Sequence, residues 1–332
     1  MQEMPVRIVT EKDLRVCIKL DHDAVKAVEQ GFAYLSQGKA TVPPILMLPV
    51  PEQQGEVDVK TAYMPDIDKL AVKIASGFFN NNKKGLPSAS GMMILLNSRT
   101  GFPEAILLDN GYLTQVRTGA AGSIAAKHLA PSTVTHAGVI GTGTQGRFQM
   151  RGLKLERDFK TLHVFSLDPE DTVEAYRREM AEELKVEVII EPTVQAVVEK
   201  SAVVVTTTPA RKGFIRAEWL HPGLHITAMG SDTEEKQELM PEVFSRADVT
   251  ACDLKSQCFS LGELRSALEA GILTRESPVI ELGELVAGTK KGRTSDNQIT
   301  LCDLTGVGVQ DTAIALQALS RAEKQGLGTV VE

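Results

Sequence analysis

The sequence predicts an α/β protein with two domains: a doubly wound parallel sheet and a second, α+β domain. From Thr133 to about Asp303, strand-like and helix-like segments alternate, which is typical of a parallel sheet with helices on both faces. Before that region, Met92–Leu96 and Ala105–Leu108 flank a turn-rich segment and predict a hairpin in an antiparallel or mixed sheet. We therefore expect two domains, with the bounds 1–130 plus 309–332 for the first and 131–308 for the second.

The first domain is expected to hold most of its strands before residue 110. Asp21 or Asp23 is placed to cap a helix over 24–35, and Asn80–Gly85 is expected to be a polar loop. A helix rich in small residues is predicted over 112–129, and a last helix, 309–324, is expected to return to this domain. The remaining expected strands are 6–9, 45–48, 57–63 and 70–75.

The second domain is expected to alternate strands with helices. The expected strands are 136–140, 161–166, 186–190, 202–207, 225–229 and 248–252. The expected helices are 144–155, 171–184 and 193–199. A doubly wound sheet binds its ligand at the carboxyl ends of its strands, so candidate residues are sought there.

Composition excludes several classes of protein. The net charge is −7, which argues against binding nucleic acid or an anionic membrane, and no apolar run reaches the roughly 18 residues of a membrane span. Residues 1–5 do not resemble a secretory signal. The four cysteines form no CxxC pair and lie beside no histidine at metal spacing, so we expect reduced thiols, no metal site and a cytoplasmic protein.

Three glycines at G-x-G-x-x-G spacing follow the apolar run that ends at Ile140. We interpret this segment as a strand, a turn and the start of a helix. In it, Gly141 permits a sharp turn, Gly143 lets the backbone approach a pyrophosphate, and Gly146 lets helix and strand pack closely. The backbone N–H groups at the helix start would face the anion. The spacing therefore predicts a dinucleotide site in a Rossmann domain.

A ribose-binding acid is expected about 20 residues beyond such a loop. The strand-like segment Leu162–Phe165 ends near Asp168, with Ser166 between them. Either residue could face the ribose, so the sequence leaves NAD and NADP both open, with NAD preferred because no arginine between Thr161 and Tyr176 could receive a 2′-phosphate.

Three ionisable residues are candidates for chemistry, and each has a structural alternative. Lys73 could be an edge-strand lysine that points to water, or a cleft ammonium with a lowered pKa. Arg117 could lie on a helix surface, or offer a forked donor to a carboxylate or phosphate. Asp232 could cap a helix starting near Thr233, or act at the carboxyl end of strand 225–229. Thr206–Thr208 ends another strand and could line the nicotinamide pocket.

Several segments, taken in order, resemble the ornithine cyclodeaminase/mu-crystallin family over nearly the whole chain. Its members are NAD(P)-dependent ornithine cyclodeaminases, alanine dehydrogenases and ketimine or imino-acid reductases, usually dimers. The segments that carry the resemblance are Leu70–Lys73, Gly85–Ser88, Gly111–Ala121, Gly141–Gln145, Gly223–Asp232 and Asp303–Gly308.

The resemblance implies a role for each matching residue. Lys73 would hold the substrate carboxylate and assist proton transfer, Asp232 would be the acid/base at the substrate nitrogen, and the first domain would supply the substrate half and the dimer interface. Arg117 and Thr305 would also contact substrate, and Lys60 is expected to do so although it departs from the family pattern. The residues expected near the cofactor are Ser88, Arg117, Thr118, Gly141, Gly143, Thr144, Gln145, Gly146, Ser166, Asp168, Thr207, Thr208, Met229, Gly230, Ser231 and Leu304.

The chain departs from the cyclodeaminase pattern at two places in the first domain. Ile45–Leu48 stands where a carboxylate-binding arginine is usual, and Val59–Tyr63 lacks the glutamate that receives a diamine substrate. Lys60 could replace the arginine's charge but would repel a substrate ammonium. The stretch Asp58–Tyr63 most resembles cyclodeaminase-like proteins of ectoine utilisation.

We therefore expect an NAD(P)-dependent oxidoreductase that acts on the Cα–N bond of a small amino or imino acid. The alternatives are a cyclodeaminase that recycles NAD and releases ammonia, and a non-catalytic protein that binds a nucleotide or small ligand. The expected partners are the substrate and a second copy of the chain.

Overall fold

The computed structural model describes residues 5–332, so Met1–Met4, part of the segment tested for a secretory signal, lie outside the described residues. The chain forms two compact units: Met1–Arg117 with Val307–Glu332, and Thr118–Gly306. The boundary falls inside helix α3 (Tyr112–Leu129), a helix that the sequence predicted with these bounds. The fold is α/β, with a Rossmann domain and a second, α+β domain.

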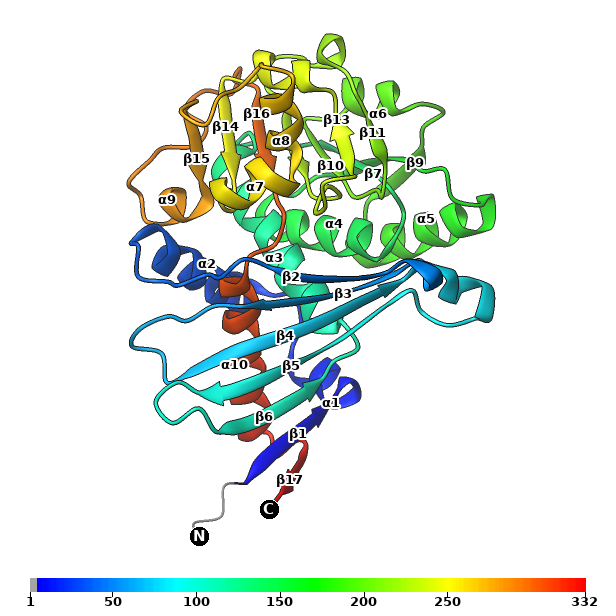
Figure 1. Cartoon of the computed structure of the whole chain (residues 1–332). Helices are drawn as coiled ribbons and strands as arrows, with labels where there is room; N and C mark the ends of the chain where they lie inside the picture. Colours follow the sequence, from blue (N-terminus) through cyan, green and yellow to red (C-terminus); the bar gives the residue numbers. More distant parts are fainter. Residues whose placement is uncertain (1–4) are drawn as a thin grey trace. The chain divides into compact units, whose positions relative to one another are not determined.

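The first unit is built on a seven-stranded mixed sheet in the order β17-β1-β6-β5-β4-β3-β2. All its strand pairs are antiparallel except β1 with β6. Helix α10 crosses one face of this sheet and packs on β3, β4 and β5 (Figure 1). The elements are β1 (Val6–Thr10), α1 (Glu11–Cys17), α2 (His22–Ser36), β2 (Leu46–Val50), η1 (Pro51–Gln53), β3 (Gly55–Thr61), β4 (Lys69–Phe78), η2 (Phe79–Lys84), β5 (Ala89–Asn97), β6 (Pro103–Leu108), α10 (Gly308–Lys324) and β17 (Thr329–Val331).

The second unit is a Rossmann domain with an eight-stranded parallel sheet in the order β15-β14-β16-β12-β10-β7-β8-β9. The strand order reverses between β7 and β10, which is where such sheets bind dinucleotides. Its strands are β7 (His136–Ile140), β8 (Thr161–Phe165), β9 (Glu187–Ile190), β10 (Val203–Thr206), β12 (His225–Ala228), β14 (Val249–Cys252), β15 (Val279–Glu281) and β16 (Thr300–Asp303), and β11 (Arg211–Ile215) pairs with β13 (Gln237–Leu239) in a small sheet.

The helices of the second unit cover the sheet, and Val, Leu and Ile side chains on its strands form the core beneath them. The helices are α4 (Thr144–Glu156), α5 (Glu170–Leu184), α6 (Val194–Lys200), α7 (Lys255–Leu261), α8 (Glu263–Glu269) and α9 (Leu282–Val286), with 3-10 turns η3 (Ala217–Trp219) and η4 (Pro241–Arg246). The sequence predicted β7 and its neighbours to within a residue or two because buried parallel strands are continuous apolar runs.

Local contacts decide three further points. Asp21, not Asp23, caps α2, since its side chain accepts a hydrogen bond from the Ala24 N–H at 2.8 Å. The expected polar loop over Asn80–Gly85 is wrong in part, because most of it forms η2. The alternative in which Asp232 caps a helix is also wrong: the chain makes a turn closed by Lys236 N–H to the Thr233 carbonyl at 3.2 Å and enters β13.

Candidate functional site

The glycine loop in the second unit has the geometry that the sequence predicted for each glycine. Gly141 has φ +106°, a conformation that L side chains rarely adopt. A Cβ on Gly146 would lie 2.3 Å from the Gly141 carbonyl oxygen, so only glycine lets α4 begin this close to β7. Gly143 caps α4 without a side-chain hydrogen bond, and a Cβ there would meet nothing within 4 Å. The space beside Gly143 at the N-terminus of α4 is thus open, and the backbone N–H groups of a helix N-terminus suit an anion.

Thr142, Ser166 and Asp168 meet beside this loop. The Thr142 hydroxyl donates to the Asp168 carboxylate at 2.5 Å, and the Ser166 hydroxyl donates to the same oxygen at 2.8 Å. The sequence treated Ser166 and Asp168 as alternatives for one position, whereas the structure brings both to one corner at the carboxyl end of β8. A carboxylate here can accept hydrogen bonds from a ribose diol.

Buried Glu238 joins the ends of two neighbouring strands. Its carboxylate accepts hydrogen bonds from the Thr206 hydroxyl at 2.6 Å, the Thr208 N–H at 2.6 Å and the Gly230 N–H at 2.8 Å. Burial raises the pKa of Glu238, although these hydrogen bonds oppose the shift. Glu238 therefore holds the turn after β10 and the turn after β12 in fixed positions.

The remaining candidates of the second unit also follow carboxyl ends of strands. The Thr207 hydroxyl donates to the Ile140 carbonyl at 3.2 Å, at the base of the glycine loop. Thr305, after β16, donates its N–H to Asp253 at 2.8 Å, and the Leu304 N–H donates to the Ala228 carbonyl at 2.9 Å. The structure thus brings together the predicted cofactor residues after β7, β8, β10, β12 and β16 along one edge of this sheet.

Lys73 lies in β4, between β3 and β5, and is 2% exposed. The edge-strand alternative is therefore wrong. Burial is the largest cause that lowers the pKa of Lys73, to about 7, and the neighbouring charge of Arg117 lowers it further, while Asp311 opposes the shift. A lysine with this pKa can either bind an anion or exchange a proton near neutral pH.

Arg117 and Asp311 complete a buried cluster around Lys73. The Lys73 Nζ lies 2.9 Å from Asp311 Oδ2, and the Arg117 Nε lies 3.0 Å from Asp311 Oδ1. Asp311 is fully buried and Arg117 is 6% exposed, so the helix-surface alternative for Arg117 is wrong. Lys60 of β3 pairs in register with Lys73 of β4 and adds a third positive charge to the cluster.

The other predicted residues take simpler positions. The Thr118 carbonyl accepts a hydrogen bond from the Gln149 side chain at 2.9 Å, and the Ser88 carbonyl accepts one from the Phe78 N–H at 2.7 Å. Asp232 is exposed and forms an ion pair with Lys236 at 2.6 Å.

Asp311 and Glu238 were not predicted from the sequence. Asp311 had a usable signal, because an acid on the apolar face of the last helix must find a charged partner when the helix is buried. Glu238 had none, since its strand, Gln237–Leu239, is only three residues long. The partners of Asp311, and Thr206 and Thr208 among those of Glu238, lie far away in the sequence.

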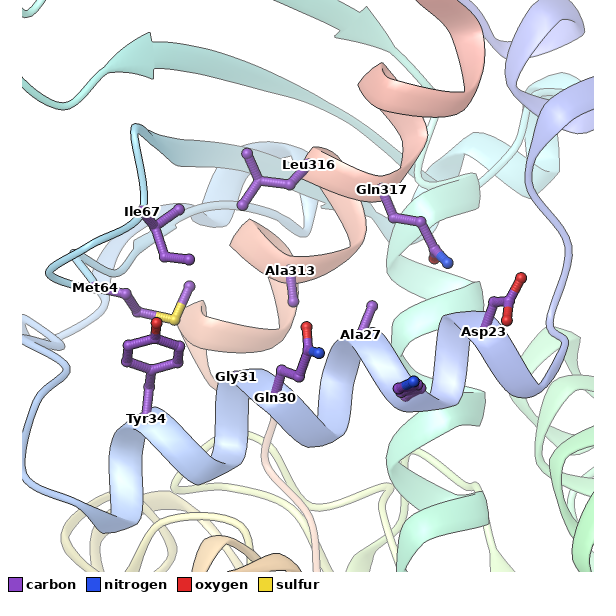
Figure 2. A pocket seen from close by; sticks show the side chains of 11 residues that line it. Asp23, Ala27, Gln30, Gly31, Tyr34, Met64, Ile67, Ala313, Leu316 and Gln317 are labelled. Atoms are coloured by element: carbon purple, nitrogen blue, oxygen red, sulfur yellow. The ribbon is translucent and has the colours of Figure 1, made fainter. Parts of the chain in front are cut away.

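Outside these clusters, a hollow of about 400 Å³ lies between α2 and α10 in the first unit (Figure 2). Apolar side chains, including Tyr34, Met64 and Leu316, line one end, and Asp23 stands at the other. None of the predicted site residues lines it. Asp23 is already paired with Arg321 at 2.8 Å.

The cysteines, the possible metal ligands and the helices of the described residues bear on other functions. All four cysteines are free and buried. Within residues 5–332, no group of three or more His, Cys, Asp or Glu side chains is arranged to hold a metal ion. None of the helices in that part of the chain is both long and apolar enough to cross a membrane.

Comparison with known proteins gives full-length matches. The profile of the ornithine cyclodeaminase/mu-crystallin family matches residues 6–326. An uncharacterized cyclodeaminase of Sinorhizobium fredii is 47% identical over 98% of this chain and 99% of its own. The Δ1-pyrroline-2-carboxylate reductase of Thermococcus litoralis, solved with NADH and L-proline, superposes with a TM-score of 0.92 at 30% identity, covering 97% of this chain and 99% of its own. An archaeal alanine dehydrogenase dimer with bound NAD superposes with a TM-score of 0.91 at 33% identity, covering 99% of this chain and 99% of its own.

Proposed function

This chain belongs to the ornithine cyclodeaminase/mu-crystallin family, and we propose that it is an NAD-dependent oxidoreductase acting on the Cα–N bond of a small amino or imino acid. One observation carries the proposal: the ammonium of Lys73 and the guanidinium of Arg117, both buried, share the buried carboxylate of Asp311, and Lys60 lies beside Lys73 in register. Buried charged donors of this kind suit a further carboxylate, and an amino or imino acid brings one.

The glycine loop and its neighbours fit the cofactor. The N-terminus of α4, where no side chain forms a capping hydrogen bond, suits the pyrophosphate, with Thr144 and Gln145 in the first turn of the helix. The carboxylate of Asp168 beside Thr142 suits the ribose. Thr207, Thr208, Met229, Gly230, Ser231 and Leu304 would line the nicotinamide end. When bound, the nicotinamide supplies or accepts a hydride.

We propose NAD(H) rather than NADP(H), because a carboxylate at the ribose repels a 2′-phosphate. Titration of purified protein with each reduced cofactor tests this by fluorescence. Asp168→Ala should narrow the difference between the affinities for NADH and NADPH. Asp171→Ala removes a nearby exposed carboxylate in α5 and serves as the matched control, in which that difference should not change. A clear preference of the wild-type protein for NADPH would contradict the assignment.

The first unit would bind the substrate carboxylate through Lys73 and Arg117, each a charged donor held in a buried position. Ser88 and Thr118 remain proposed cofactor contacts, and Thr305 a proposed substrate contact. Asp232 would hold or release the proton at the substrate nitrogen, since an exposed carboxylate can exchange that proton with water.

A cyclodeaminase remains the second candidate, because the Sinorhizobium relative carries that description. Such an enzyme forms a ring from a diamine, releases ammonia and returns its cofactor unchanged. Lys60 beside Lys73 disfavours a substrate with a second ammonium, which is why we place the reductase first.

The deciding experiment has two assays. The first supplies NADH with either Δ1-pyrroline-2-carboxylate or pyruvate and ammonia. The second supplies L-ornithine with a catalytic amount of NAD. Loss of NADH in step with proline or alanine formation supports the reductase. Ammonia release without net cofactor consumption would replace it with the cyclodeaminase. Cofactor binding without turnover of any tested substrate would instead favour a non-catalytic binding protein.

We also propose a homodimer formed through the first unit. Leu46 and Leu48 of the edge strand β2 are 59% and 56% exposed, and exposed apolar side chains along a strand edge commonly mark an interface. Sedimentation analysis of the wild-type protein and of Leu46→Lys/Leu48→Lys tests this. A monomeric wild-type protein, or an unaltered dimer in the variant, would contradict it.

A further inference from the structure

We propose that Asp311 is a positioning residue that holds the Lys73 ammonium and the Arg117 guanidinium in the first unit and competes with an incoming substrate carboxylate for them. The substrate part of this inference rests on the function proposed above. The part that concerns Lys73 and Asp311 alone can be tested without any substrate.

Close backbone packing places Asp311 under the sheet. A Cβ on Gly308, at the start of α10, would lie 2.2 Å from the Thr61 carbonyl oxygen of β3. One turn later, the Thr312 hydroxyl accepts a hydrogen bond from the Ala71 N–H of β4 at 3.3 Å. These contacts fix the first turn of α10 against β3 and β4, so Asp311 reaches Lys73 in a defined geometry.

The carboxylate of Asp311 bridges two elements. Its two oxygens lie 2.9 Å from Lys73 on β4 and 3.0 Å from Arg117 on α3. Because the pairs use different oxygens, one anion orients both cations at once. A substrate carboxylate would bind the same cations, so it would share them with Asp311.

The charges that act on Lys73 come from several elements. Arg117 on α3 and Lys60 on β3 lower its pKa, as burial does, and Asp311 on α10 raises it. The buried carboxylate of Asp109, which precedes α3, also interacts with the charge of Lys73. Removing the charge of Asp311 leaves Lys73 beside two cations, so its proton should be lost at a lower pH.

This arrangement predicts a crossover in Asp311→Asn. At low pH, Lys73 is protonated in both proteins, and the variant should bind a carboxylate more tightly because no internal anion competes. At higher pH, the variant has lost the Lys73 proton while the wild type keeps part of it, so the variant should bind more weakly. A variant that was merely misfolded would bind more weakly at every pH.

The first test measures the ionisation of Lys73 directly. Wild type and Asp311→Asn are produced with isotopically labelled lysine, and NMR follows the chemical shift of the Lys73 Cε, assigned by its absence in Lys73→Met, from about pH 5 to about pH 9. We expect a midpoint near 7 in the wild type and a midpoint at least about one unit lower in the variant. An unchanged midpoint would overturn the proposal.

A matched control keeps the result specific. Asp21→Asn makes the same substitution in the same unit and weakens a pair with Arg321 of α10, whose Nη1 lies 3.1 Å from Asp21. Asparagine also caps helices, so α2 should persist. The Lys73 midpoint should not move in this control, and a shift equal to that of Asp311→Asn would show a general effect of disturbing α10, against the proposal.

The second test measures L-proline binding by calorimetry, with NADH present, across the same pH range. A crossover between wild type and Asp311→Asn supports the competition. Weaker binding by the variant at every pH refutes it. If the wild type binds no proline at any pH, proline is excluded as a ligand of the proposed function, and the NMR titration still decides the role of Asp311 toward Lys73.

Discussion

Replacing Gly143 with alanine should weaken NADH binding while leaving the second unit folded. Gly143 has φ −74°, which alanine adopts freely, and a Cβ there would meet nothing within 4 Å. Alanine is a poorer N-cap than glycine, which lowers the free energy of unfolding by up to about 1 kcal/mol. Alanine also restricts the unfolded chain, which raises the free energy of unfolding by about 0.4–1 kcal/mol. The free energy of unfolding should therefore change by less than about 1 kcal/mol.

The same methyl group would occupy the space through which a phosphate approaches the α4 N-terminus. We expect the Kd for NADH to rise at least about tenfold, which corresponds to about 1.4 kcal/mol. Fluorescence titration with NADH measures the affinity, and urea unfolding measures the stability.

Gly146→Ala is the matched comparison in the same loop. Its Cβ would lie 2.3 Å from the Gly141 carbonyl oxygen, a backbone atom that cannot move without opening the turn between β7 and α4. Overpacking of this kind costs about 1–3 kcal/mol, so this variant should lose stability as well as affinity. If Gly143→Ala binds NADH as tightly as the wild type, the pyrophosphate does not approach Gly143 and the assignment of this loop is wrong.

Three further outcomes are expected. Asp232→Asn should lower turnover roughly a hundredfold with little change in NADH affinity, as for loss of a general acid/base, whereas Lys73→Met should also raise KM; wild-type kinetics in both would refute the assigned roles. L-Ornithine should be a poor substrate because its distal ammonium would meet Lys60, and rapid proline and ammonia formation would show that Lys60 points elsewhere. Burial lowers the pKa of His225 to about 3, below its unfolded value near 6.5. The free energy of unfolding that this shift contributes is therefore present above pH 6.5 and is lost as the pH falls toward 3, by about 2 kcal/mol between pH 7 and pH 5. Urea unfolding should show this loss in the wild type and a smaller one in His225→Asn.

The sequence by itself determined the glycine loop, strands β7, β8, β9, β10, β12 and β14 and helices α4, α5 and α6 of the Rossmann domain. It did not predict β11, β13, β15, β16 or helices α7, α8 and α9. Strand β7 and helix α3 have the bounds expected for them, because a buried parallel strand and a small-residue helix each leave a local, continuous pattern. The close approach of Gly146 to the Gly141 carbonyl oxygen could also be interpreted locally, whereas the contact of Gly141 with Thr207, after β10, could not.

Only the tertiary structure decided which charges meet. Whether Lys73 lay on an edge or inside the sheet depended on β3 and β5 on either side of β4, and its partner Asp311 is supplied by the last helix. The alternative of a helix cap at Asp232 is wrong because the chain that follows pairs with β11 instead of forming a helix. A local pattern reports the propensity of a segment, whereas burial and ion pairing depend on residues that are distant in the sequence and meet only when the chain folds.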